Sequence, residues 1–311
     1  MFNSVLKSGR GIQLGAALAC GLFLPLSSVL VQAAPKNLEL KGQFALSDSE
    51  FKSELLSAGE AEEITSRNYA VTAYLSSLNA GDGPLAEAAF TGRNASFYAT
   101  RSNTDLPLLD GSSATLDVMQ QSWGFTGSKG NAFFNVELGR SEYGTGGTAL
   151  ESESRSMGFG LYGAESTRVS LRYSEHENLI LIPGNIDGDV ANWQFNARWL
   201  GSSDSSDSSI AVDATIGYLE IDYSNVLVED EEGLTLSLGT VIYPNDRVGV
   251  SLSFAEDLLD NWNREEFNVG VEWFASENLS LSLSYREARI KLSGLSPVDS
   301  EQHLLGARLR F

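Results

Sequence analysis

The chain of 311 residues has few of the side chains that metal centres and thiol chemistry require, with one cysteine and two histidines. This scarcity excludes a disulfide framework and a Cys/His zinc site, so we expect neither a cofactor nor a metal. Basic residues are also few, because 21 lysines and arginines stand against 41 acidic residues, which gives a net charge of −20. Such a chain repels phosphate, and a nucleic acid is therefore not an expected partner.

Long apolar runs are missing beyond the first 34 residues. A helix that crosses a bilayer needs about 20 consecutive apolar residues, so no helical span is expected there. Two options remain for the rest of the chain. It is either a soluble domain or a closed β-barrel, because a barrel is the other structure that satisfies every backbone polar group inside a membrane.

The first residues have the pattern of an export signal. Lys7 and Arg10 form a positive start, residues 11–24 are mostly apolar and uncharged, and small residues follow. This order of charge, apolar run and small residues is typical of a cleaved signal peptide. We predict a signal peptide over residues 1–33 and a mature domain over residues 34–311; an uncleaved anchor would need a longer apolar run.

The mature chain alternates between apolar and polar residues with a period of two. In residues 278–290, leucines and a tyrosine at odd positions alternate with three serines and an arginine at even positions. Successive side chains of a strand point to opposite faces, so the segment is predicted to be a strand with one apolar face. The same alternation occurs in residues 168–173, 193–199, 234–239, 248–254 and 267–273.

A soluble β-sandwich would also show this alternation, but three features favour a membrane barrel. The alternating segments recur at about ten residues each, as transmembrane strands do. Their polar faces are rich in serine, glycine, threonine and asparagine, which suit a water-filled interior. Aromatic residues lie near the ends of the apolar faces, where membrane interfaces hold them. These are Tyr173, Trp193, Trp199, Phe254, Trp273 and Tyr285. We predict an all-β, transmembrane, antiparallel up-and-down β-barrel.

The chain ends in the middle of an alternating segment, with Leu305, Ala307, Leu309 and Phe311 on its apolar positions. This end resembles the C-terminal strand of Gram-negative outer-membrane β-barrels, which finishes in phenylalanine and is read by the barrel-insertion machinery. The resemblance implies a place in the outer membrane, contact with its lipid and lipopolysaccharide, and Phe311 as the membrane-insertion signal. The segment Gly83–Phe90 is in addition similar to a porin family of Gram-negative bacteria, which implies a pore.

Counting strands back from the C-terminus predicts about 14, an even number as in bacterial single-chain barrels. Twelve stays open if the first segment, Asn37–Leu46, and one weak neighbour do not join the sheet. Outer connections are expected to be long, among them Ser47–Thr65, where a short helix could form, and His176–Asp189. Periplasmic connections are expected to be tight, as at Pro244–Arg247.

A polar interior is costly unless water fills it, so we expect a channel for passive diffusion of small hydrophilic solutes. Charged residues on the polar parity are the candidate pore lining: Arg168, Arg172, Arg198, Arg286, Arg308, Arg310, Glu137, Asp213 and Glu272. We expect Arg286 and Arg308 to lie near each other in a basic ladder that favours anions, which arginine binds through a rigid fork. Alternatively, the arginines pair with interior acids and brace the wall.

Two other functions stay open at this point. The barrel could be structural or adhesive without conducting, or it could be an outer-membrane hydrolase built on His176 or His303. Ser174 shares a face with His176, but Glu175 points to the opposite side, so the three residues do not form a catalytic triad. We therefore expect no enzyme and name no catalytic residue; association of several copies is open.

Overall fold

The computed structural model describes residues 39–53, 62–79, 95–107, 115–145, 148–163, 166–182, 186–202, 208–223, 230–292 and 297–310. The predicted signal peptide, the segment Gly83–Phe90 and Phe311 lie outside these residues. Within the described ranges, no helix is both long enough and apolar enough to cross a membrane.

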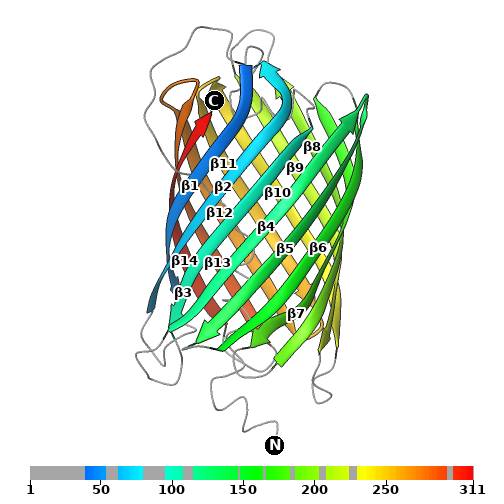
Figure 1. Cartoon of the computed structure of the whole chain (residues 1–311), viewed down its shortest axis with the longest axis vertical. Helices are drawn as coiled ribbons and strands as arrows, with labels where there is room; N and C mark the ends of the chain where they lie inside the picture. Colours follow the sequence, from blue (N-terminus) through cyan, green and yellow to red (C-terminus); the bar gives the residue numbers. More distant parts are fainter. Residues whose placement is uncertain are drawn as a thin grey trace, which may run out of the picture.

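Every regular element in the described residues is a strand. The strands are β1 (Glu39–Ser53), β2 (Glu62–Asn79), β3 (Ser96–Pro107), β4 (Thr115–Lys129), β5 (Ala132–Thr145), β6 (Thr148–Tyr162), β7 (Thr167–Ile182), β8 (Ile186–Ser202), β9 (Ser209–Tyr223), β10 (Glu231–Asn245), β11 (Val248–Leu259), β12 (Trp262–Phe274), β13 (Leu279–Leu292) and β14 (Val298–Arg310). Each pairs antiparallel with its neighbours in the sequence, and the sheet closes into a barrel (Figure 1). The predicted fold is confirmed.

The barrel is closed by the pairing of its first and last strands. The β1–β14 register runs without a shift from Gln43 opposite Arg310 to Ser53 opposite Ser300. Closure leaves no strand edge with unpaired backbone groups, as a sheet inside a bilayer requires. Because the first segment is a full member of the sheet, the twelve-stranded alternative is wrong.

The strands are longer than the alternation predicted, and the connections at one end are correspondingly shorter. β1 continues to Ser53 and β2 begins at Glu62, so most of the loop expected over Ser47–Thr65 is strand. β8 likewise begins at Ile186, inside a predicted loop. Most of the extra residues are charged or polar, so their sequence shows no alternation of apolar and polar residues. The backbone ladder continues there because its hydrogen bonds need no apolar face, whereas a polarity pattern cannot mark such residues as strand.

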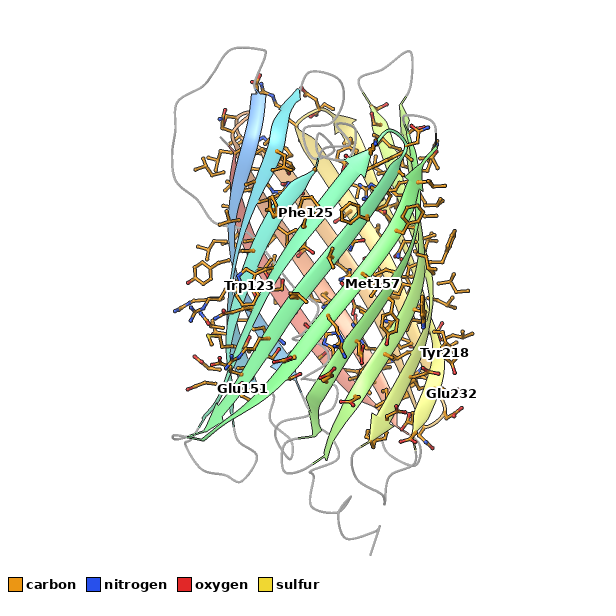
Figure 2. The ribbon with its side chains drawn as sticks, turned by 45° about the vertical axis from the view of Figure 1, so that its right-hand side comes forward. Trp123, Phe125, Glu151, Met157, Tyr218 and Glu232 are labelled. Carbon is orange, nitrogen blue, oxygen red and sulfur yellow. The ribbon has the colours of Figure 1, made fainter. Side chains whose placement is uncertain are left out.

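The outward face of the barrel is an apolar band. Large hydrophobic side chains are strongly exposed along successive strands, for example Met157 on β6 at 62%, Leu283 on β13 at 61% and Leu305 on β14 at 64%. Figure 2 shows side chains projecting outward from the wall along its height. An exposed apolar surface of this extent is what hydrocarbon covers in a membrane barrel.

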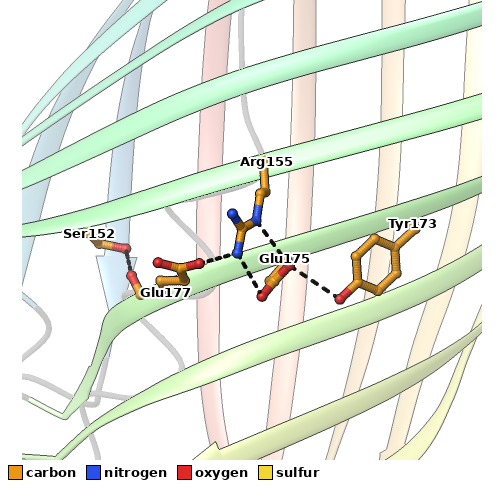
Figure 3. A network of polar contacts seen from close by, with 5 residues as sticks. All are labelled: Ser152, Arg155, Tyr173, Glu175 and Glu177. Carbon is orange, nitrogen blue, oxygen red and sulfur yellow. Dashed lines mark hydrogen bonds and ion pairs between the residues drawn. The ribbon is translucent and has the colours of Figure 1, made fainter.

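Charged residues replace the apolar band toward the end of the barrel away from Arg310. Tyr218 donates a hydrogen bond to Glu232 across β9 and β10, and both lie on the outside of the wall (Figure 2). Arg155 pairs with Glu175, with 3.1 Å between Nε and Oε2, and also with Glu177 (Figure 3). Such aromatic and charged groups are suited to the boundary between hydrocarbon and water, and they mark where the band ends.

Candidate pore lining

Positions that alternate with the apolar band point into the barrel, and small polar residues dominate them. On β13 the inward residues include Ser280, Ser282 and Ser284, and on β3 Thr100 bonds to Ser122 of β4 at 2.6 Å. All nine candidate lining residues lie at inward positions, since each has the parity opposite to that of the exposed apolar side chains of its strand. The interior therefore carries charged groups set among hydroxyls and glycines.

Glu137 of β5 is the centre of one interior cluster. Its Oε2 accepts hydrogen bonds of 2.9 Å from Tyr98 Oη of β3 and from Arg172 Nη2 of β7. Arg172 also donates to Ser156 of β6, at 2.9 Å from Nη2 to Oγ. The side chains of Arg172 and Glu137 keep 38% and 24% of their surfaces exposed, so the pair is accessible from inside the barrel.

A second cluster lies on β7, β8 and β9. Arg198 and Asp213 are direct partners in the β8–β9 register, with 2.5 Å between Nη1 and Oδ2. Arg168 lies opposite Arg198 on β7 and places its guanidinium 5.6 Å from the centre of the Phe133 ring. Two like charges opposite each other in a sheet repel, and Asp213 offsets part of that repulsion.

A third cluster joins four charged groups of β11, β12 and β13. Arg264 Nη1 lies 3.2 Å from Asp257 Oδ2, and its Nη2 contacts Glu266. Glu266 in turn contacts Arg286. The exposed fractions of Arg264 and Glu266 are only 8% and 10%, so this charge-balanced cluster is packed into the wall.

The fourth cluster lies near the C-terminal end of β14. Arg308 Nη1 is 3.3 Å from Glu272 Oε1 of β12, which also accepts a 2.7 Å hydrogen bond from Ser280. Arg310 is buried, with its guanidinium 4.6 Å from the centre of the Phe274 ring.

The expected basic ladder of Arg286 and Arg308 does not form. Arg308 lies opposite Ser280 in the β13–β14 register, and Ser280 is six residues from Arg286 along β13. The strands place the two arginines at different heights, each beside its own carboxylate.

Several interior charged residues were absent from the candidate set. Arg264 was missed because it precedes the alternating segment 267–273, so its parity was not considered. Asp257 was missed for the matching reason, since it follows the alternating segment 248–254. Extending the alternation by three residues at these two ends would have found both.

The two histidines lie on opposite sides of the wall. His176 of β7 is inward, on the same face as Ser174, whereas His303 of β14 is outward and packs against Tyr285 at 5.2 Å between ring centres. They cannot contribute to one site. In the described part of the chain, no group of three or more histidine, cysteine or acidic side chains is arranged to hold a metal ion.

No family model matches the chain, and no curated protein is similar to it in sequence. Solved structures are similar in fold. The CymD monoaromatic hydrocarbon channel has 8% identity over 97% of this chain and 93% of its own, with a TM-score of 0.57. The outer membrane protein Omp33 of Acinetobacter baumannii has 14% identity over 88% of this chain and 99% of its own, with a TM-score of 0.52. A TodX mutant, also a monoaromatic hydrocarbon channel, has 9% identity over 89% and 91%, with a TM-score of 0.52. The chain thus has the fold of outer-membrane β-barrels, a fold that hosts more than one function.

Proposed function

We propose that the protein is an outer-membrane channel for the passive diffusion of small hydrophilic solutes, with a preference for anions. The observation that carries this proposal is the closed barrel of 14 strands, in which small polar residues and ion pairs occupy inward positions midway along the wall, while apolar side chains such as Phe133 and Leu259 lie inward toward its ends. A barrel of about eight strands fills its interior with side chains, whereas a larger one has room for water. Water in turn solvates the polar wall, which would otherwise be costly to bury.

The interior chemistry favours hydrophilic over apolar solutes. Two of the similar structures are titled monoaromatic hydrocarbon channels. In this chain, the inward residues midway along β12 and β13 are Asn268, Gly270, Ser282 and Ser284, none of which offers an apolar surface. Charged groups that keep part of their surface exposed, such as Arg172, would exchange contacts with a hydrated solute.

The preference for anions is argued from the sign of the interior charge. Among the inward side chains that the structure describes, seven are arginines and six are carboxylates, a net charge of +1 in a protein of −20. Arginine stays charged at every relevant pH and binds carboxylate or phosphate through two parallel hydrogen bonds. Because most of these arginines also contact an acid, they brace the wall and line it at the same time.

Arg172→Gln should shift ion selectivity toward cations. The change removes an interior positive charge beside Glu137, so the reversal potential in a salt gradient should move toward the cation value and the anion-to-cation permeability ratio should fall by about twofold. Arg155→Gln is the matched control, because Arg155 lies on the outside of the wall. Equal shifts in both variants would contradict the assignment of Arg172 to the lining; absence of any stepwise conductance in planar bilayers would contradict the channel itself.

We further propose that the mature chain lies in the outer membrane, in contact with its lipid and lipopolysaccharide, and that the insertion machinery reads its C-terminal residue. Deleting Phe311 should then strongly reduce the amount of heat-modifiable barrel in outer-membrane fractions, and Phe311→Tyr should restore most of it because an aromatic end is kept. Normal assembly of the deletion variant would overturn the role given to Phe311.

A further inference from the structure

The interior charges are sorted along the barrel axis. We call the end that holds Arg310 the terminal end, where the C-terminus lies in Figure 1, and the opposite one the far end. In barrels of this class both termini face the periplasm, so the terminal end is the periplasmic one. The strand bounds and the alternation give each inward charge a height between these two ends.

Positive charge collects at the terminal end. Within four residues of the terminal-end limits of their strands, the described inward charged side chains are four arginines and two carboxylates, a net charge of +2. They are Arg168, Arg198, Arg308, Arg310, Asp213 and Glu272. Asp213 and Glu272 each contact one arginine, which leaves the layer positive as a whole.

Negative charge collects at the far end. There the described inward charged side chains are two arginines, Arg264 and Arg286, and three carboxylates, Glu231, Asp257 and Glu266, a net charge of −1; Arg286 belongs to this layer because it contacts Glu266. Between the two layers lie Glu137 and Arg172, which form an ion pair. Glu231 is buried at the start of β10, and its neighbours Asp230 and Glu232 add exposed negative charge at the same end.

We infer that this axial separation of charge makes the channel rectify, so that it conducts more when the far side is positive than when it is negative. The inference rests on the proposed channel function and adds a direction to it. Cations pass more readily from the far end to the terminal end, and anions pass more readily from the terminal end to the far end.

The physical reason lies in where mobile ions accumulate. Fixed carboxylates concentrate cations at the far end, and fixed arginines concentrate anions at the terminal end. A positive far side drives both ions into the barrel from the ends where they are abundant, so the interior fills with carriers. The opposite voltage drives each ion in from the end that excludes it, so the interior is depleted. The Debye length is about 10 Å at 0.1 M salt and about 3 Å at 1 M, so rectification should weaken as salt is added.

The test is a planar-bilayer recording with the orientation of each channel known. The only cysteine of the chain, Cys20, falls in the predicted signal peptide, so Ala275→Cys in the exposed turn between β12 and β13 gives the mature chain one thiol at the terminal end. A membrane-impermeant charged thiol reagent then changes the current only from the chamber that this end faces. At 0.1 M salt we expect currents at equal and opposite voltages to differ by about 1.5-fold or more, larger with the far side positive, and to approach equality at 1 M.

Paired variants separate interior charge from surface charge. Glu231→Gln with Arg168→Gln removes one inward charge from each layer, and the current ratio should fall toward 1. Glu232→Gln with Lys129→Gln removes outward charges at similar heights and should leave the ratio unchanged. Symmetric current at 0.1 M salt in a conducting channel, a reversed ratio, or equal effects of the two pairs would overturn the inference while the channel stands. Absence of conductance would instead overturn the proposed function.

Discussion

Arg264→Ala should destabilise the barrel more than any other single charge removal that the structure suggests, by about 3–5 kcal/mol. Arg264 is 8% exposed and contacts both Asp257 and Glu266. Without it, two carboxylates stay packed in the wall of β11 and β12 with Arg286 as the remaining cation of the cluster. Urea unfolding of the protein refolded in lipid vesicles, followed by tryptophan fluorescence, measures the change.

Arg289→Ala is the matched control on the same group of strands. Arg289 of β13 makes two hydrogen bonds to Asp299 of β14, at 2.6 and 2.9 Å, but both side chains are more than 40% exposed on the outside of the wall. Water solvates both partners when the pair is broken, so stability should hardly change. If the two variants unfolded at the same urea concentration, the buried cluster would not be the brace that its geometry indicates.

Leu283→Arg should cost about 2–4 kcal/mol of stability in a bilayer, whereas the adjacent Ser284→Arg should cost far less. Leu283 is outward, 61% exposed, and lies in the register between Val271 and Leu305 in the middle of the apolar band. An arginine there meets hydrocarbon, and an arginine at Ser284 meets the solvated interior.

The two substitutions should differ in a second measurement, because only one of them changes the interior. Ser284→Arg should lower single-channel conductance by adding bulk and charge to a wall of small residues. Leu283→Arg channels that do insert should conduct normally. Equal loss of stability in both variants would mean that the two faces of β13 meet similar surroundings, which no membrane barrel allows.

The sequence predicted the number of strands and their faces because the bilayer imposes a strict period of two wherever a strand crosses it. The ends of the strands were predicted less well, because the parts of a strand that lie outside the bilayer do not need an apolar face. β6 begins at Thr148 and β14 at Val298, in both cases before any alternation of apolar and polar residues is visible, because glutamates and an aspartate occupy the outward positions there while the backbone pairing continues. Strand ends in water are held by backbone hydrogen bonds, which leave no trace in the side-chain pattern.

For the charged residues of the interior, the sequence predicted the face of the strand on which each lies but not the residue that each contacts. Alternation gave the side on which Arg286, Arg308 and Glu272 lie. It could not give their neighbours, because those depend on register, and register is fixed by the stagger accumulated from strand to strand around the whole barrel. A shift of a few residues separates a basic ladder from two distinct ion pairs, and the structure has the ion pairs.

The pairing of β1 with β14 also limits when folding of the barrel can finish. β1 can pair with β14 only after β14 has been synthesised. Until then, a partly formed sheet has two edges with unpaired backbone groups, and the apolar faces of its strands are exposed to water. A sheet that lacks either of these two strands cannot close into a barrel of this register inside a bilayer. Closure of the barrel is therefore the last step of its folding, and it needs both end strands in place.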